Sequence, residues 1–505
     1  MRQPLERLKE RLAEIAALER VERLLSWDLQ TMMPAAGAAI RASHLATLHR
    51  LEHDLLVDGE TARLLEAVRP LEESLDPESD DACLIRLARR DFEKAVRVPS
   101  ELRAEMARAA AEARPIWKRA KAESDFASFL PALERNFELR RRYVECFEPV
   151  DEPYDVLLDD FEPEATAAWV RELFDELRDE LVPMIKVLSE REVDDSFLRG
   201  SFPVERQEAL AHELVYLLGT RADSWRLDPT EHPFASGAGI DDVRITTNYD
   251  PESLKSLFST MHEYGHGLYT HQIPREIAHL PTGNACSLGI HESQSRLWEN
   301  MVGRGVPFWR FFYPRLREVF PEQLRGVELD RFYAAINRVQ PSLIRIRADE
   351  VTYGLHVILR FELEQDVVHG RVAVRDLPDA WNAKVSEYLG LDVPDDARGV
   401  LQDTHWAGGQ IGYFATYLLG SVMSVQIWQR MADDVPDVDE QIERGEFQAL
   451  REWLGDHVHR HGKKFSPQET LRRAIGTTID PRPYLAYLSA KYEVGVLNLA
   501  GDQPT

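Results

Sequence analysis

The chain has 505 residues, of which 44% are hydrophobic and 29% are charged, and its formal net charge is −26. A chain of this length and composition buries a large core, which excludes an intrinsically disordered protein. The acidic surplus repels phosphate backbones and anionic lipids, so we expect neither nucleic acid nor a membrane among the partners.

The N-terminal segment predicts an amphipathic helix. Its apolar residues recur every three or four positions from Leu5 to Leu18, and charged residues fill the opposite face. Because these charges run throughout, and because no stretch of 18 apolar residues occurs in the sequence, we expect neither a signal peptide nor a transmembrane helix. The three scattered cysteines fit reduced thiols, so we expect a cytoplasmic protein.

Helical periodicity returns at 40–55, 210–218 and 351–363, whereas strand-like alternation is scarce. We therefore expect a mostly α protein with one small sheet. No linker, repeat or low-complexity tract divides the chain, so we expect a single domain over residues 1–505, built as one body or two lobes. The helices of about the first 75 residues are expected to cover a cleft or to pack against the body.

The clearest strand is the alternating run from Asp242 to Thr247. As an edge strand it would offer unpaired N–H and C=O groups to an extended peptide. A structural strand inside a small sheet is the alternative, and the two roles are compatible. We expect a small edge sheet directly before the next helix.

The segment 250–268 predicts that helix. Asp250 is a favourable N-cap and Pro251 suits the first helical position. A buried stripe is supplied by Leu254, Leu257, Phe258, Met261 and Leu268. His262 and His266 are four positions apart, so they project from the same face, where two imidazole nitrogens can share one cation.

Glu263 predicts the chemistry of this helix. A carboxylate beside a metal ion can accept the proton of an attacking water and deliver it to a leaving amine. The pattern His262-Glu263-x-x-His266 therefore indicates a zinc-dependent peptidase with Glu263 as general base. A chance match is the alternative, and the helical context disfavours it.

A catalytic zinc site needs a third protein ligand and one open position. The metzincin pattern would require glycine and histidine where the chain has Tyr269 and Gln272, so that solution is absent. The other solution is a glutamate on a later helix, and segment 291–300 offers Glu292, which is our choice. Glu299, two turns further on nearly the same face, is the alternative ligand or an orienting partner of a ligand imidazole.

Further motifs follow one another along almost the whole chain. They are LSWD at 25–28, MP at 33–34, HPF at 232–234, DDVRIT at 241–246, HEYGH at 262–266, HESQS at 291–295, IRIRADEVTY at 344–353, GVLQDTHW at 399–406 and IGYF at 411–414. A lone HExxH motif occurs in many unrelated peptidases. The ordered set, however, resembles the M32 metallocarboxypeptidases, the carboxypeptidase Taq family.

The resemblance implies a large, almost wholly helical, zincin-like body with a deep active-site groove. It implies a cytosolic homodimer that removes single residues from peptides with a free C-terminal carboxylate, with broad side-chain tolerance. It also implies Glu292 as the third ligand. We expect one divalent ion per chain, zinc in our interpretation, and cobalt or manganese would fit the same ligands.

A carboxypeptidase must hold the terminal carboxylate of its substrate with a fixed cation. The match to the family motif favours Arg345 as that cation, and Arg347 is the alternative. Asp349, four residues after Arg345, is expected to pair with it on one helical face and to hold its guanidinium in place. An ordinary surface ion pair is the competing interpretation.

Four more residues are assigned to substrate binding. His405 and Tyr413 flank a Gly-containing stretch and are expected to stabilise the oxyanion that forms during hydrolysis, or else to pack in an aromatic cluster with Trp406 and Phe414. His232, in the HPF motif, and Arg244, in the DDVRIT motif, belong near the site by resemblance.

Two other functions compete with this interpretation. A helical zinc oligopeptidase or a dipeptidyl carboxypeptidase would share the zinc chemistry but cut at another distance from the terminus. An inactive peptide-binding scaffold would share the fold, but it would have no need of Glu263 as a base.

Overall fold

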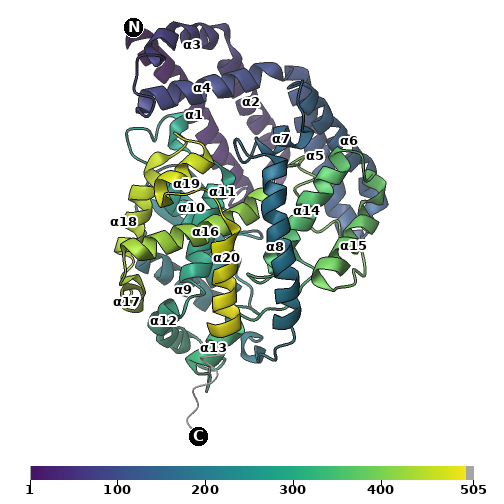
Figure 1. Cartoon of the computed structure of the whole chain (residues 1–505), viewed down its shortest axis with the longest axis vertical. Coiled ribbons are helices and arrows are strands. Elements are labelled where there is room, and N and C mark those ends of the chain that lie inside the picture. Colours follow the sequence, from purple (N-terminus) through teal and green to yellow (C-terminus); the bar gives the residue numbers. More distant parts are fainter. Residues whose placement is uncertain (1, 496–505) are drawn as a thin grey trace. The chain divides into compact units, whose positions relative to one another are not determined.

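The computed structural model describes residues 2–495. Most of these residues lie in α-helices, and three short strands form one sheet (Figure 1). The expectation of a mostly α protein with a small sheet is therefore confirmed. The four helical periodicities noted in the sequence correspond to α1 (Arg2–Thr31), α2 (Ala38–Val57), α9 (Val204–Leu217) and α14 (Tyr353–Val368).

The described chain forms two compact units, each assembled from segments that are distant in sequence. The first unit contains residues 2–96, 195–329 and 427–478, and the second contains residues 97–194, 330–426 and 479–495. The single domain expected over 1–505, the helical cover at about 1–75 and the deep groove stay predictions.

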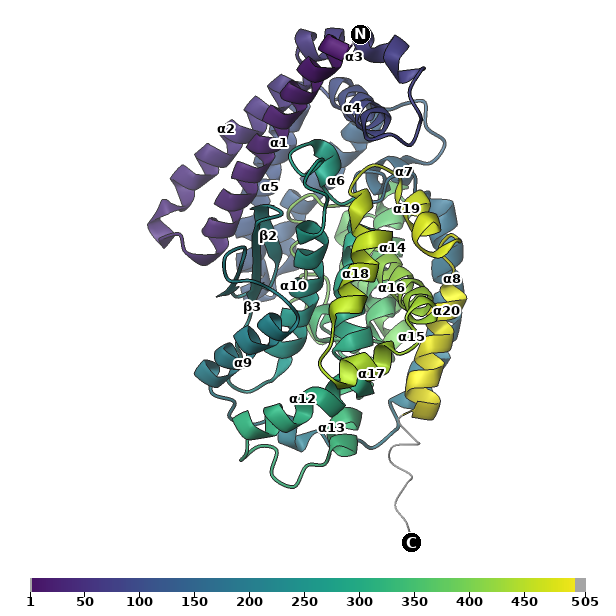
Figure 2. The same ribbon diagram turned by 90° about the vertical axis from the view of Figure 1, so that its left-hand side faces the viewer.

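The first unit holds α1, α2, α9 and the sheet. Its other helices are α3 (Gly59–Glu72), α4 (Asp80–Arg97), α10 (Lys255–His271), α11 (Leu288–Arg296), α12 (Val306–Val319), α17 (Val438–Glu443), α18 (Gln448–His457) and α19 (Pro467–Ile475). The apolar face of α1 packs with α3 and α4 in a core that includes Leu8, Val68 and Ile85. Helix α2 runs beside α1, as Figure 2 shows, and has no buried residue.

The sheet consists of β1 (Trp225–Pro229), β2 (Ala235–Gly239) and β3 (Asp242–Thr247), in the order β1-β3-β2. β3 pairs in parallel with β1 and antiparallel with β2. The edge-strand role expected for 242–247 is therefore wrong, because β3 is the central strand and both of its sides are paired. Alternation in a sequence reveals a half-buried strand, but it does not reveal the neighbours of that strand.

Helix α10 approaches its neighbours closely on two faces. A Cβ atom at Gly267 would lie 2.5 Å from a ring atom of Trp225 in β1, and one at Gly265 would lie 2.4 Å from the carbonyl oxygen of Gln294 in α11. Both contacts are shorter than a side chain tolerates. The two glycines therefore let α10 pack directly between the sheet and α11, where Figure 2 shows it beside β2 and β3.

Helix α10 begins at Lys255, later than expected, and Asp250 does not cap it. The Asp250 carboxylate accepts a hydrogen bond from the backbone N–H of Glu252 at 2.9 Å, which closes a local turn. The carbonyl of Pro251 accepts a bond from the N–H of Phe202 at 2.7 Å, so this turn is tied to the chain just before α9. Asp250 and Pro251, which we expected to begin the helix, therefore belong to this turn.

The second unit is built around α14. Its other helices are α5 (Ser100–Glu123), α6 (Phe126–Glu145), α7 (Pro153–Leu158), α8 (Ala167–Leu188), α13 (Leu329–Ile336), α15 (Leu377–Leu389) and α20 (Pro481–Leu488); α16 (Ala415–Asp434) is divided between the units. Helix α8 packs against α14 and also runs beside α20 (Figure 1). Helix α14 is buried along its length, yet it carries His356, Arg360 and Glu364, each fully buried. A buried charge needs a partner, and Arg360 leads to one of the candidate sites below.

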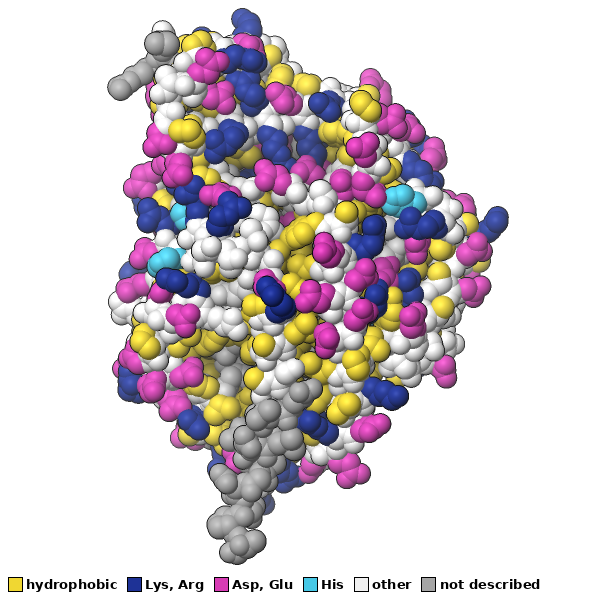
Figure 3. All heavy atoms as spheres, viewed as in Figure 1, with side chains coloured by type: hydrophobic (Ala, Val, Ile, Leu, Met, Phe, Trp, Pro, Cys, Tyr) yellow, Lys and Arg dark blue, Asp and Glu magenta, His cyan; other side chains and the backbone are white. Residues whose placement is uncertain are grey.

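The surface mixes charges of both signs. On the face drawn in Figure 3, acidic and basic side chains are interspersed. Charged side chains also form ion pairs on the surface, such as Arg315 with Glu213 at 2.9 Å. Within residues 2–495, no helix combines the length and the apolar character needed to cross a bilayer.

Candidate metal centre

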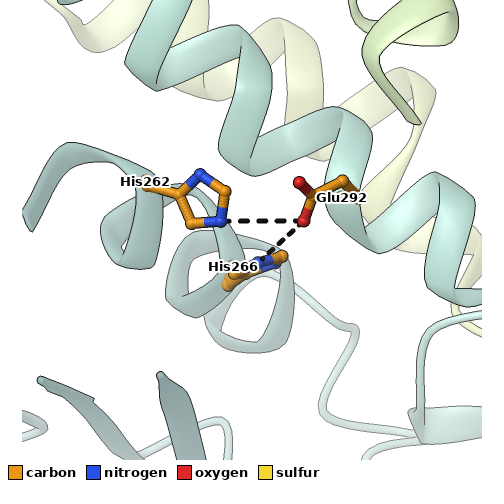
Figure 4. A group of neighbouring side chains, drawn as sticks. All are labelled: His262, His266 and Glu292. Atoms are coloured by element: carbon orange, nitrogen blue, oxygen red, sulfur yellow. Dashed lines mark ion pairs between the residues drawn. The ribbon is translucent and has the colours of Figure 1, made fainter. Parts of the chain in front are cut away.

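Three side chains predicted as metal ligands lie together in the first unit. His262 and His266 project from one face of α10, and Glu292 reaches them from α11 (Figure 4). The Nε2 atoms of His262 and His266 lie 3.6 Å and 3.4 Å from the same oxygen, Oε2 of Glu292. The imidazole rings are nearly perpendicular, with 4.9 Å between their centroids.

This donor set fits a small divalent cation. Atoms bound to a tetrahedral zinc ion at about 2.0–2.2 Å are separated from one another by roughly 3.3–3.6 Å, and the distances from Glu292 to the two imidazoles agree with that separation. Two imidazole nitrogens and one carboxylate oxygen are also the ligand types of catalytic zinc sites.

Glu263 supplies a second observation that fits a metal centre. The residue is only 5% exposed, and its Oε2 atom has no hydrogen-bond partner among the described residues. Burying a carboxylate oxygen without a hydrogen-bond donor costs free energy. This oxygen therefore suits a hydrogen bond from a further group, such as a water molecule. Burial also raises the pKa of Glu263, which suits a group that accepts and then releases a proton.

The second nitrogen of each imidazole has its own partner. Nδ1 of His262 lies 2.9 Å from Oε2 of Glu299, and Nδ1 of His266 hydrogen-bonds Nδ1 of His291. An imidazole that binds a cation through Nε2 keeps its proton on Nδ1, so Glu299 and His291 act as acceptors. These two contacts hold each imidazole in the tautomer and orientation that binding a cation through Nε2 would need.

Glu299 lies in a π-helical turn, Leu297–Val302, that follows α11 directly. This turn packs tightly against α10, because a Cβ atom at Gly303 would lie 2.7 Å from the sulfur of Met261 and equally close to the carbonyl oxygen of Glu299. Turns of this kind are rare and often occur at functional sites.

Arg296 balances the negative charge around the centre. Its guanidinium donates to Oε1 of Glu292 at 2.7 Å and to Oε2 of Glu299 at 3.2 Å. Burial opposes the ionisation of both carboxyls, but Arg296 and the imidazoles outweigh it. They lower the pKa of Glu299 to about 2 and hold the pKa of Glu292 well below its ordinary value.

The predicted carboxylate anchor, Arg345, is buried in the second unit. Its guanidinium donates to Oδ1 of Asp403 at 2.8 and 3.1 Å and to the hydroxyl of Tyr353 at 3.1 Å. The expected pairing with Asp349 is wrong, because 345–347 forms a short 3-10 turn and Asp349 instead accepts bonds from backbone N–H groups, including that of Thr352 at 2.9 Å.

Arg360 completes this group from α14. Its guanidinium donates to the other oxygen of Asp403, Oδ2, at 2.7 Å. Two arginines thus share one carboxylate, and they hold the pKa of Asp403 well below its ordinary range even though burial opposes its ionisation. The group carries one positive charge in excess. Arg347, the alternative anchor, is exposed.

His405 and Tyr413 lie together near Arg345 in the second unit. Nε2 of His405 lies 3.1 Å from the hydroxyl of Tyr417, and its buried Nδ1 has no partner among the described residues. Burial first, and then the charge of Arg345, lowers the pKa of His405 to about 3, so the ring is neutral. The rings of His405 and Tyr413 are 5.1 Å apart, and Phe414 is 4.5 Å from His405.

His232 and Arg244 belong to the first unit. His232 is exposed in the loop between β1 and β2. Arg244, on β3, bonds Asp242 at 2.7 Å, and its guanidinium lies 4.4 Å from the ring of Trp27 in α1. In this structure Arg244 therefore helps to hold α1 on the sheet.

The sequence and the fold are similar to those of known proteins. The family model described as carboxypeptidase Taq (M32) metallopeptidase matches residues 7–492. Thermostable carboxypeptidase 1 of Thermus thermophilus is 41% identical over 491 residues, which covers 95% of this chain and 96% of the relative. The M32 carboxypeptidase structure from Deinococcus radiodurans R1 superposes with a TM-score of 0.94 at 38% identity, over 99% of this chain and 100% of that chain. Metallocarboxypeptidase 1 of Trypanosoma cruzi superposes with a TM-score of 0.91 at 32% identity, over 97% and 100%.

The chain belongs to the carboxypeptidase Taq (M32) family. This M32 protein is therefore an enzyme, a carboxypeptidase of the metallopeptidase class, which acts on peptides with a divalent metal ion. The expected resemblance is confirmed over nearly the whole chain.

Sequence reasoning missed several residues of this M32 carboxypeptidase that contact the predicted site residues. His291 and Arg296 contact predicted ligands, and each had a signal: His291 directly precedes Glu292, and Arg296 lies four residues after it on the same helical face. Asp403 and Arg360 lie 58 and 15 positions after Arg345, and no sequence spacing connects them to it.

Proposed function

We propose that the protein is a zinc-dependent metallocarboxypeptidase that removes single residues from peptide C-termini with broad side-chain tolerance. The observation that carries this proposal is the convergence of His262, His266 and Glu292. It is supported by the buried Oε2 of Glu263, which has no hydrogen-bond partner among the described residues. A divalent cation held by these three ligands supplies a Lewis acid for the scissile carbonyl and the attacking water. Zinc suits the donor set, and cobalt or manganese can replace it.

Glu263 acts as the general base. Its Oε2 atom accepts the proton of the attacking water and then delivers that proton to the leaving amine. Burial raises the pKa of Glu263, and a higher pKa makes its carboxylate a better proton acceptor. Glu299 and His291 meanwhile keep the ligand imidazoles in one tautomer.

Arg345 binds the terminal carboxylate of the substrate. The support is electrostatic: Arg345 and Arg360 share the single carboxylate of Asp403, so the buried group retains one positive charge that a substrate anion can neutralise. Arg345 is preferred over Arg347 because bonds to Asp403 and Tyr353 fix its guanidinium, whereas Arg347 is exposed.

Four further residues are proposed to contact the substrate. Nδ1 of His405 has no hydrogen-bond partner within residues 2–495, and the ring of Tyr413 lies 5.1 Å from that of His405, which suits a donor to the developing oxyanion. His232 and Arg244 are proposed from the family resemblance alone.

We further propose a single-domain, cytoplasmic homodimer whose first 75 or so residues cover the cleft. Among the described residues, Cys83, Cys146 and Cys286 form no disulfide bond, which agrees with a reducing compartment. Sedimentation of the purified protein tests the dimer directly.

One pair of measurements tests the proposed activity. Metal analysis should give one divalent ion per chain, and mass spectra of a digested peptide over time should show a ladder that shortens by one residue from the C-terminus. Internal fragments would indicate an oligopeptidase, and steps of two residues would indicate a dipeptidyl carboxypeptidase. Bound peptide without cleavage in the metal-loaded protein would indicate a scaffold.

A further inference from the structure

Glu292 uses its two carboxylate oxygens for different partners. Oε2 lies 3.6 Å and 3.4 Å from the Nε2 atoms of His262 and His266 and accepts a bond from Oγ of Ser295 at 3.2 Å. Oε1 accepts a hydrogen bond from Nε of Arg296 at 2.7 Å. A carboxylate can bind a cation through one oxygen or through both, but here only Oε2 faces the imidazoles.

We propose that Arg296 is a positioning residue that makes Glu292 a one-oxygen metal ligand and thereby keeps a coordination position open for the substrate. This inference rests on the proposed role of Glu292 as a ligand. A glutamate that bound through both oxygens would occupy an additional position, which a catalytic centre must leave open.

The same guanidinium also connects two parts of the centre. Arg296 donates through Nη1 to Oε2 of Glu299 at 3.2 Å, and that oxygen is the one that lies 2.9 Å from Nδ1 of His262. Arg296 thus fixes one ligand directly and a second ligand through its orienting partner. The Arg296 and Glu292 side chains are 13% and 6% exposed, so little solvent competes for these bonds.

An arginine is better suited than a lysine to hold both carboxylates in fixed positions. Its rigid, planar fork presents N–H groups in several fixed directions, whereas a lysine supplies a single ammonium at the end of a flexible chain. Arg296→Lys therefore keeps the positive charge but loses the fixed hydrogen bond to Oε1 of Glu292. This variant tests whether Arg296 acts by positioning Glu292 or only by balancing its charge.

The test uses the full-length enzyme, stripped of metal and reloaded with Co²⁺, whose visible absorption weakens when a four-coordinate site becomes five-coordinate. We expect Arg296→Lys and Arg296→Met to show this weakening and to bind Co²⁺ about 10- to 100-fold more weakly in competition with a chelator. Arg304→Met is the matched control, because Arg304 approaches Oε1 of Glu299 at 3.8 Å and stacks over Phe258. Its Co²⁺ spectrum should match that of the unmodified enzyme.

Several outcomes would overturn the inference. An unchanged spectrum and an affinity within twofold in Arg296→Lys would show that Arg296 does not set the coordination of Glu292. If neither variant folds, a crystal structure of the unmodified enzyme with Co²⁺ decides the matter: one Glu292 oxygen on the ion supports the inference, and two oxygens refute it. If Glu292→Ala binds Co²⁺ normally, the proposed ligand set itself is wrong.

Discussion

Nδ1 of His262 and Oε2 of Glu299 lie 2.9 Å apart, although 37 positions separate the two residues in sequence. The contact gives Glu299 a role distinct from that of Glu292, whose Oε2 faces the Nε2 atoms of both histidines. The two glutamates, which lie seven positions apart, should therefore differ in how strongly they affect metal binding.

Glu292→Ala should lower metal affinity more than Glu299→Ala, because a direct ligand contributes more than a residue that orients one. We expect a loss of about 10- to 100-fold for Glu299→Ala and a larger loss for Glu292→Ala. Metal retained after dialysis against a graded chelator measures both. The reverse ranking would make Glu299 the ligand.

Glu263→Gln should bind metal almost normally and lose nearly all turnover. Glutamine keeps the shape of the side chain but cannot accept a proton from water. The measurement is kcat at a confirmed metal content. The control is Glu252→Gln, the same change at an exposed position shortly before α10, which should leave kcat unchanged. Substantial turnover by metal-loaded Glu263→Gln would contradict the general-base assignment.

Arg345→Ala should impair cleavage of a free-acid peptide and spare its C-terminal amide. The loss of a charge-assisted contact worth ~1.5–3 kcal/mol predicts a decrease of roughly 10- to 150-fold in kcat/KM for the acid. The amide, which lacks the charge, should already be a poor substrate and should change little. Blocking the N-terminus of the peptide should have little effect.

Arg347→Ala is the matched control for Arg345, because Arg347 lies two positions away and is exposed. It should cleave the acid peptide at the normal rate. If Arg347→Ala shows the selective loss and Arg345→Ala does not, then Arg347 is the anchor. Equal cleavage of acid and amide by the unmodified enzyme would contradict carboxylate recognition altogether.

His459 should make the protein less stable in mild acid. The residue is fully buried, and burial lowers its pKa from 6.5 to about 3. Between these values the unfolded chain binds a proton that the folded chain does not, so stability falls as the pH decreases below about 6.5, by up to ~1.4 kcal/mol per pH unit. Above pH 6.5 this residue adds no pH dependence.

The thermal midpoint of metal-free protein at pH 7.5 and at pH 5.5 measures this effect. His459→Gln, which keeps polar atoms for Gln272 and Gln294, should show a smaller decrease between the two pH values. His44→Gln, at an exposed site, should behave like the unmodified protein. If the thermal midpoint decreases equally in all three proteins, His459 does not cause the loss of stability in acid.

Local periodicity could predict the face shared by His262 and His266, because a helix fixes the relative direction of residues four positions apart. Glu292 could be chosen from the sequence because it lies on the helix that follows the two histidines. In the structure this helix brings Glu292 to the histidines. The family resemblance supplied the expectations for the second unit.

Contacts between distant segments could not be predicted in this way. The neighbours of β3 are short, Gly-rich or Pro-terminated strands with weak signals of their own. The expected pair of Arg345 and Asp349 requires a helix over both residues, but 345–347 forms a tight turn. Arg345 pairs with Asp403 instead. A side chain's partner depends on where the chain returns, which a pattern within one segment does not contain.

Gly265 lies between Glu263, the proposed base, and His266, a proposed ligand, at a position to which no chemical role is assigned. Its missing side chain lets the backbones of α10 and α11 touch, since a Cβ atom there would meet the carbonyl oxygen of Gln294 at 2.4 Å. Contact between the two main chains therefore limits how closely Glu292 in α11 can approach the two histidines of α10. If His262, His266 and Glu292 bind an ion as proposed, this backbone contact therefore also bears on the size of the ion that they can hold.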